Sequence, residues 1–360
     1  MGVGRGPVAA LDRGFWSGKR VLLTGHTGFK GSWAAIWLNG IGAEVTGLAL
    51  PPDQTPALFE LADVGGLVRS RFADLRHPAE IDEAIGSDAF DLVLHMAAQP
   101  IVRTSIEDPI ATLASNIMGT ANLLQALRAQ PGLKAVLVVT SDKVYANTEA
   151  GRAFVETDAL GGKDPYSASK AATEIVVASF AKSYFDARGV PVATARGGNV
   201  IGGGDFSRDR LVADIVRAAR GQEPVLLRHP ESTRPWQHVL DCVAGYLVQL
   251  QALATDPATP RAINFGPRPG GPDVTVGQLA TLGVEALGAQ PWRHEPDPKS
   301  LEARTLAIDA GLAKRVLGFE SRLDAPRAVA LTMDWYRRQA NGEDALGLCR
   351  EQIAAYEGVA

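Results

Sequence analysis

The feature that most constrains this chain is a glycine-rich turn between a short apolar run and a helical pattern. The run KRVLLTG covers residues 19–25, and three glycines then follow one another at a spacing of three. Glycine allows a tight turn and a close approach of the backbone, while the free N–H groups of a helix N-terminus attract an anion. A turn without a ligand is the alternative, but at the first strand-to-helix step a dinucleotide site is favoured. Its predicted contacts are Gly25, Thr27, Gly28, Phe29 and Gly31.

The first half of the chain continues to alternate apolar runs with amphipathic stretches. The predicted strands cover residues 19–25, 43–50, 69–74, 90–98, 133–141 and 190–200. The predicted helices cover residues 28–41, 79–85, 109–128 and 165–188. This alternation predicts an α/β fold, a Rossmann-like doubly wound parallel sheet with helices on its faces. The helix at 109–128 is apolar around much of its circumference, which indicates burial in the core or at a subunit contact.

Glycine and proline become frequent after residue 200, and this indicates a second, less regular lobe. Helical patterns return at residues 210–220, 240–252, 276–287, 309–317 and 325–341. We therefore expect a dinucleotide-binding domain over residues 15–200 and a lobe that mainly binds substrate over residues 201–360. The boundary is expected to be interleaved near residues 225–240 and 260–267. There, the runs at 225–227 and 262–265 are predicted to return a strand to the first sheet.

Composition narrows the class of protein. The chain has 360 residues, a net charge of -4 and 46% apolar residues, which is typical of a globular enzyme and not of a duplex-binding protein. Its two cysteines, Cys242 and Cys349, have no Cys or His neighbours at metal-ligand spacing, so we expect no metal site and no disulfide framework. No apolar run approaches the roughly 20 residues of a membrane helix. The expected location is the cytoplasm, with no membrane or nucleic-acid partner.

The end of the second strand bears on the choice of nicotinamide cofactor. NAD-selective sites usually place an acid near the adenosine ribose there, whereas NADP-selective sites place a basic residue. This chain has two prolines and then Asp53, with no Arg or Lys nearby. The pattern favours NAD, with Asp53 as a predicted ligand.

Further cofactor contacts are expected where the next strands end. Asp74 follows the third strand, beside Leu75, and its carboxylate could accept from the adenine amino group. An exposed acid that caps a turn is the alternative for Asp74. Ala97 and Ala98 end the fourth strand, followed by Gln99. Small residues in that place permit a close approach of the cofactor.

A tyrosine and a lysine at helical spacing indicate redox chemistry on a hydroxyl. Tyr166 and Lys170 are four residues apart on the helix at 165–188, so both project from one face. An ammonium beside a phenol should lower the pKa of the tyrosine, which could then take a proton while hydride leaves the same carbon. Ser141, at the end of the preceding strand, could hydrogen-bond the same oxygen.

With these residues in place, the chain resembles the extended short-chain dehydrogenase/reductases that act on nucleotide-sugars, from residue 19 to beyond residue 335. It is most similar to the CDP-glucose 4,6-dehydratase group. That narrower likeness is carried by GHTGFKGSW, HMAAQPIVR, TSDKVY, GGKDPYSASK, GNVIGGGDF, RPWQHVL and NFGP. The dTDP-linked dehydratases carry Asp-Glu where this chain has Asp142-Lys143. The chain departs from the family's usual RAGN and GDW with RGGN and GDF, and neither change removes a reactive group.

The resemblance implies a reaction and roles for the catalytic residues. It implies oxidation at C-4 of a nucleotide-diphosphate hexose, loss of water and return of the hydride from a recycled NAD to C-6. Ser141, Tyr166 and Lys170 would serve the oxidation, and Asp142 would act as the acid. Lys143 would act near C-5, as a base when its amine is neutral, unless the pair is only a structural ion pair. The other interpretations are a 4-epimerase, a dehydratase for another nucleotide-hexose and an NAD-sensing protein without catalysis.

The substrate and partner subunits are the last expectations. Arginine forks match phosphate oxygens, and Asn and His supply further hydrogen bonds, although any such arginine could instead be a solvated surface charge. The candidate substrate contacts are Arg103, Asn116, Asn199, Arg210, Arg234 and His238. The family's habit of pairing the helices at 109–128 and 165–188 in a four-helix bundle implies a homodimer or homotetramer.

Overall fold

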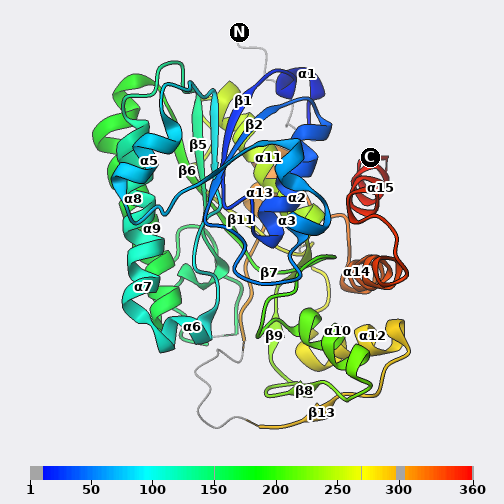
Figure 1. The fold of residues 1–360 in the computed structure, drawn as a ribbon. Coiled ribbons are helices and arrows are strands. Elements are labelled where there is room, and N and C mark those ends of the chain that lie inside the picture. Colours follow the sequence, from blue (N-terminus) through cyan, green and yellow to red (C-terminus); the bar gives the residue numbers. More distant parts are fainter. Residues whose placement is uncertain (1–10, 150, 269, 297–304, 359–360) are drawn as a thin grey trace.

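The structure is a computed structural model that describes residues 11–149, 151–268, 270–296 and 305–358. Its centre is a seven-stranded parallel sheet in the order β11-β6-β5-β4-β1-β2-β3 (Figure 1). The strands are β1 (Arg20–Thr24), β2 (Glu44–Ala49), β3 (Arg69–Phe72), β4 (Leu92–His95), β5 (Ala135–Val139), β6 (Val192–Gly197) and β11 (Ala262–Phe265). The strand order reverses between β1 and β4, and in such sheets the crevice at the carboxyl ends there receives the ligand. The predicted doubly wound parallel sheet is confirmed.

Helices cover both faces of this sheet. One face carries α5 (Pro78–Ile85), α8 (Gly119–Leu127) and α9 (Pro165–Phe180), and the other carries α2 (Phe29–Gly40), α11 (Val239–Thr255) and α15 (Ala345–Gly358) (Figure 1). Successive strand side chains point to opposite faces. In β5, Leu137 belongs to the larger core under α2 and α11, whereas its neighbours Val136 and Val138 belong to the core under α8 and α9. Both faces are apolar because both are covered.

The two long helices on the face that carries α8 and α9 are interrupted by π-helical turns. The helix predicted at 109–128 consists of α7 (Pro109–Leu113), η1 (Ala114–Met118) and α8 in one continuous run. α9 runs into η3 (Ala181–Phe185) and η4 (Asp186–Arg188). Several large apolar side chains on these helices stay exposed, among them Ile110 (72%), Met118 (53%) and Ile175 (62%). This helix pair therefore has an apolar outer face that no other described segment of the chain covers.

The smaller lobe lies beyond the carboxyl end of the sheet (Figure 1). It contains the helices α10 (Leu211–Gly221) and α12 (Val276–Leu287). It also contains two pairs of short strands. β8 (Leu226–Leu227) pairs with β13 (Arg293–His294), and β9 (Thr233–Arg234) pairs with β12 (Val274–Thr275). β7 (Asn199–Ile201) and β10 (Trp236–His238) form a parallel pair that leads into it. The chain then returns through α11 and β11, and ends with α13 (Gly311–Leu317), α14 (Ala325–Ala340) and α15.

The expected return of strands to the main sheet is half right. β11 does take the edge beside β6, as predicted for residues 262–265. The expectation for residues 225–227 is wrong, because β8 pairs with β13 in the small lobe. Leu226 is 55% exposed, and a side chain so exposed would not suit a parallel sheet covered on both faces. α11 also covers the main sheet, so much of the segment after residue 200 supports the first domain.

Candidate active site

A cleft opens between the carboxyl end of the sheet and the small lobe. Its walls come from the start of α2, the turn after β5, the start of α9, β7 and the segments around α10 and β9. The polar side chains that line it include Lys30, Ser141, Asp142, Lys143, Tyr166, Asn199, Arg210 and Arg234. Residues from both halves of the chain therefore meet in one site.

The glycine-rich turn is shaped to receive a pyrophosphate. A Cβ on Gly25 would lie 2.8 Å from the Ala97 nitrogen, and one on Gly31 only 1.9 Å from the Gly25 oxygen, so both glycines are required by packing. Gly28 is different: it is exposed at the N-cap of α2, and its Cβ would meet nothing closer than 3.5 Å. The Thr27 hydroxyl donates to the Leu50 carbonyl at 2.9 Å and ties the turn to the end of β2. The open side of Gly28 and the free first-turn N–H groups of α2 fit a dinucleotide.

The other predicted cofactor residues follow the neighbouring strands. Asp53 is exposed in the loop after β2. Asp74 is held in a bidentate pair with Arg76, whose hydrogen bond lowers the pKa of that carboxyl. Leu75 is buried against α8, and Gln99 uses its amide to bind the Ile101 backbone and the Thr112 hydroxyl. Asp53, Asp74 and the pair Ala97 and Ala98 thus follow the carboxyl ends of β2, β3 and β4 in turn.

Tyr166 and Lys170 are buried at the start of α9, which Pro165 and the Asp164 capping box begin. Ser141 lies beside Tyr166 in the cleft, where it lowers the pKa of the Tyr166 phenol. Burial raises the pKa of the Tyr166 phenol by more than Ser141 lowers it, so the net shift is opposite in direction to the decrease expected from a neighbouring ammonium. Lys170 instead donates to the Val139 carbonyl at 3.1 Å, and burial lowers the pKa of its amine to about 7.

Asp142 and Lys143 share a short 3-10 turn, η2 (Asp142–Val144), directly after β5. Adjacent residues on a strand point apart, but Ser141 accepts the Lys143 N–H at 3.2 Å and turns the chain, so both side chains line the cleft. Asp142 is 1% exposed, and its Oδ1 lies 3.6 Å from the Lys143 Nζ and accepts from Ser141 at 2.9 Å. Its other oxygen, Oδ2, is buried without a partner among the described residues. A buried carboxylate oxygen left in this way is available to a hydrogen-bond donor of a ligand.

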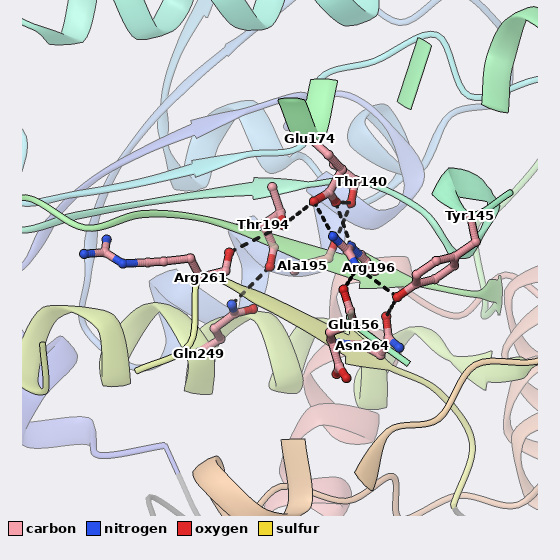
Figure 2. Close-up of polar contacts among 10 residues, drawn as sticks. All are labelled: Thr140, Tyr145, Glu156, Glu174, Thr194, Ala195, Arg196, Gln249, Arg261 and Asn264. Atoms are coloured by element: carbon pink, nitrogen blue, oxygen red, sulfur yellow. Dashed lines mark hydrogen bonds and ion pairs between the residues drawn. The ribbon is translucent and has the colours of Figure 1, made fainter. Parts of the chain in front are cut away.

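A buried ion pair behind the cleft holds these elements together (Figure 2). Glu174 on α9 and Arg196 on β6 are each 5% exposed and approach to 2.8 Å. Glu174 also accepts from the hydroxyls of Thr140, at the end of β5, and Thr194, on β6. The carboxylate is thus fully engaged, and it fastens α9 across the ends of two strands.

The network continues from Arg196 to the catalytic turn. The guanidinium donates to the Tyr145 hydroxyl at 2.9 Å, and that hydroxyl donates to Asn264 on β11 at 2.6 Å (Figure 2). Arg196 also donates to the Glu156 carbonyl at 3.0 Å. Because Tyr145 follows η2 directly, this chain of bonds fixes the turn that carries Asp142 and Lys143.

Four of the six predicted substrate residues line the cleft: Arg103, Asn199, Arg210 and Arg234. The structure assigns different roles to Asn116 and His238, which do not line it. Asn116 lies in η1 and binds both backbone groups of Gln99 and the Ser169 hydroxyl, so it braces the loop after β4. His238 is fully buried, and its Nδ1 accepts from the Leu240 N–H to cap α11. Motif position alone could not separate a residue that supports the cleft from one that faces it.

Sequence reasoning missed several basic residues of the cleft, among them Lys30 and Arg228. Lys30 is in the first turn of α2, and Arg228 follows β8. The sequence does contain a signal for Lys30. It is a single lysine in the first turn of a largely apolar helix, directly before eight residues that are buried. Arg228 stands in a proline-rich loop and carries no comparable signal.

The sequence predicts no metal site, no disulfide and no membrane helix, and the structure bears on these predictions only for the residues that it describes. Among these residues, no group of His, Cys, Asp and Glu side chains could hold a metal ion. Both cysteines are buried free thiols. No helix in the described ranges has the length and hydropathy to cross a bilayer.

Comparison with known proteins identifies relatives over most of the chain. Residues 21–266 match the model of the NAD dependent epimerase/dehydratase family. The chain is 39% identical to a CDP-glucose 4,6-dehydratase of Salmonella typhimurium, over 96% of this chain and 98% of that protein. It is 29% identical to a dTDP-glucose 4,6-dehydratase of Streptomyces griseus, over 88% of this chain and 94% of the relative. Among solved structures, DesIV, a dTDP-glucose 4,6-dehydratase from Streptomyces venezuelae with NAD and TYD bound, is 25% identical with a TM-score of 0.76, covering 91% and 99% of the two chains.

The buried ion pair leads to a prediction about stability. Glu174→Gln should lower the free energy of unfolding by about 3 kcal/mol, because it leaves the Arg196 charge buried without a full partner. Urea denaturation followed by circular dichroism measures this. The matched control is Glu44→Gln, whose ion pair with Arg69 is exposed (56% and 61%). That change should cost less than about 1 kcal/mol. Equal losses in the two variants would contradict the importance given to the buried pair.

Proposed function

The chain belongs to the NAD dependent epimerase/dehydratase family, and we propose that it is a nucleotide-sugar 4,6-dehydratase that converts CDP-glucose to CDP-4-keto-6-deoxyglucose and water. One observation carries the proposal: the Asp142–Lys143 pair lies in the same cleft as Ser141 and Tyr166. A 4-epimerase needs groups for oxidation and reduction at one carbon but has no step for a second acid and amine. The Salmonella relative's name supports the choice of CDP-glucose.

The cofactor is NAD, which accepts hydride from C-4 and returns it at C-6 when bound. The open N-terminus of α2 at Gly28 would hold the pyrophosphate. Asp53, Asp74 and the small residues Ala97 and Ala98 are our proposed contacts for the adenosine and the rest of the dinucleotide, since they follow β2, β3 and β4 at the switch point.

Tyr166 acts as the base of the oxidation. It accepts the proton of the C-4 hydroxyl, and Ser141 holds the same oxygen in place. Burial raises the pKa of this phenol, so positive charge nearby is needed to favour the phenolate. Lys170, one helical turn away and anchored on the Val139 carbonyl, is placed to supply it when protonated.

Asp142 and Lys143 carry out the elimination. Once C-4 is a ketone, loss of the C-5 proton gives an enolate, and the C-6 hydroxyl leaves after it is protonated. The unpartnered Oδ2 of Asp142 is suited to face that hydroxyl as the acid. Lys143 is more exposed (28%) and reaches into the cleft beside it, where its neutral amine takes the C-5 proton. Two groups with different chemistry thus stand next to one sugar.

Arginines on the far wall supply the binding site for the nucleotide diphosphate. Arg103, Arg210, Arg228 and Arg234 all line the cleft. Their forked N–H groups match phosphate oxygens. The unpartnered Oδ1 of Asn199, in the same wall, would accept from a ligand donor.

We further propose a homodimer or homotetramer and a cytoplasmic location. The outer face of α7, η1 and α9 carries exposed Ile110, Met118 and Ile175, and burial of such apolar area drives association. The two cysteines are free thiols, as is usual in a reducing compartment.

The reaction itself is tested with a set of nucleotide-sugars. With CDP-glucose, mass spectrometry should show a product lighter by one water, with no net consumption of NAD. dTDP-, UDP- and GDP-hexoses should react much more slowly. Tyr166→Phe should bind CDP-glucose but form almost no enzyme-bound NADH in a single turnover, because no base takes the hydroxyl proton. A product of unchanged mass would indicate an epimerase, and no turnover of any sugar would favour an NAD-sensing protein.

Lys143→Met separates oxidation from elimination. The first hydride transfer should remain largely intact, so enzyme-bound NADH should accumulate, while exchange of the C-5 hydrogen with deuterated solvent should be lost. Absorbance of NADH and mass spectrometry of the sugar measure the two steps. The control is Lys134→Met, an exposed residue at the opposite end of β5. If Lys143→Met formed 4-keto-6-deoxy product at a near wild-type rate, Lys143 would have no role in elimination.

The subunit contact is tested by charge. The double variant Ile110→Arg/Ile175→Arg should shift the light-scattering mass from a dimer or tetramer to a monomer, because it puts two cations in an apolar interface. Val316→Arg, at an exposed apolar residue of α13 (37%), should leave the mass unchanged. A wild-type protein that is monomeric at micromolar concentration would exclude the proposed contact.

A further inference from the structure

Lys30 is a charged residue of the cleft to which the reaction described above gives no role. It lies in the first turn of α2, a helix whose next eight residues, 31–38, are all buried. Its side chain is half-buried, lines the cleft and places its Nζ 5.8 Å from the centre of the Tyr246 ring on α11. A lysine in such a position is not part of a solvated surface.

The ammonium of Lys30 has no carboxylate partner. Among the residues that the structure describes, none of the acids lies within ion-pair distance of it, and its Nζ makes no hydrogen bond. Lys30 shares the cleft with the carboxylates of Asp142 and Asp205, and its charge adds to the burial that lowers the pKa of the Lys170 amine. Burial lowers the pKa of the Lys30 amine, and the two nearby carboxylates counteract that shift. A half-buried amine in the wall of the cleft, in contact with the Tyr246 ring and with no carboxylate of the described residues within ion-pair distance, leaves its charge available to a ligand.

The position of Lys30 along the cofactor's path identifies that ligand. Its backbone belongs to the turn that would hold the pyrophosphate, between Gly28 and Gly31. Its side chain lines the same cleft as Asp142 and Tyr166. Hydride can pass from the sugar only if the nicotinamide ring lies beside Tyr166. A nicotinamide ring bound beside Tyr166 would share the cleft with the Lys30 ammonium.

We propose that Lys30 is an electrostatic residue for the cofactor, which makes bound NADH more stable relative to bound NAD⁺ than it would otherwise be. The inference rests on the proposed function. The oxidised nicotinamide ring is a cation and the reduced ring is neutral, so a neighbouring ammonium repels only the oxidised form. In a dehydratase the reduced cofactor must persist until water has left, because an early return of hydride to C-4 would only regenerate the substrate. A positive charge beside the ring stabilises the enzyme with reduced cofactor relative to the enzyme with oxidised cofactor, and so favours this persistence.

The test measures the redox preference of binding and does not depend on turnover. Wild-type protein and the variants are equilibrated with a fixed mixture of NAD⁺ and NADH, freed of unbound cofactor, and the bound ratio is determined by absorbance. Lys30→Met and Lys30→Gln should lower the bound NADH to NAD⁺ ratio by about tenfold, because each removes a unit charge that acts on the ring inside a partly desolvated cleft. Lys30→Arg, which keeps the charge, and Lys134→Met should retain the wild-type ratio.

The outcomes separate this inference from the proposed function. An unchanged ratio in both neutral variants would overturn the role of Lys30, as would an equal loss of affinity for the two cofactor forms, which indicates packing or pyrophosphate binding alone. Lys30→Gln keeps a long polar side chain over Tyr246, so it provides the measurement if Lys30→Met does not fold. A wild-type protein that binds neither NAD⁺ nor NADH would instead contradict the proposed function.

Discussion

The buried pair between Glu174 and Arg196 is the interaction on which the rest of the site depends. It joins α9, which carries Tyr166 and Lys170, to β6 and to the end of β5, from which Asp142 and Lys143 extend. A buried ion pair is costly to desolvate, and only complete hydrogen bonding offsets that cost. Glu174 meets this condition through Thr140, Thr194 and Arg196 together (Figure 2). The network therefore sets the relative positions of the groups for oxidation and elimination.

The cleft in front of this network contrasts with it, because some of its polar atoms lack protein partners. Oδ2 of Asp142 and Oδ1 of Asn199 are both buried without a hydrogen bond among the described residues. Behind the cleft, every oxygen of Glu174 is bonded. This difference between the cleft oxygens and the Glu174 oxygens has a physical reason. A buried polar atom that loses water and gains no hydrogen bond destabilises the fold, unless a ligand supplies the missing hydrogen bond. An unpartnered carboxylate oxygen in the cleft, held in place from behind by a fully bonded ion pair, is typical of a preorganised binding site.

Much of the fold could be predicted because its signals are local. The three glycines of the first turn, the apolar run at 133–141 and the proline that starts α9 each specify a backbone conformation without reference to distant residues. Errors arose where distant contacts decide. A short apolar run at 225–227 could pair with any free edge, and the small lobe supplied β13. Asn116 and His238 occur in motifs beside cleft residues, yet η1 and the start of α11 turn them toward the protein interior.

The sequence by itself determined the order of strands and helices and the chemical groups available, because periodicity, glycine spacing and the i, i+4 relation of Tyr166 and Lys170 are properties of neighbouring residues. It could not determine which charges meet. Burial raises the pKa of Tyr166 where the motif alone predicts a decrease, and Lys30 acts on Lys170 from a helix 140 residues earlier in the chain. Only the tertiary structure decided these effects, since the strength of an electrostatic interaction depends on distance and on access to water, and both are set when the sheet, its helices and the small lobe pack together.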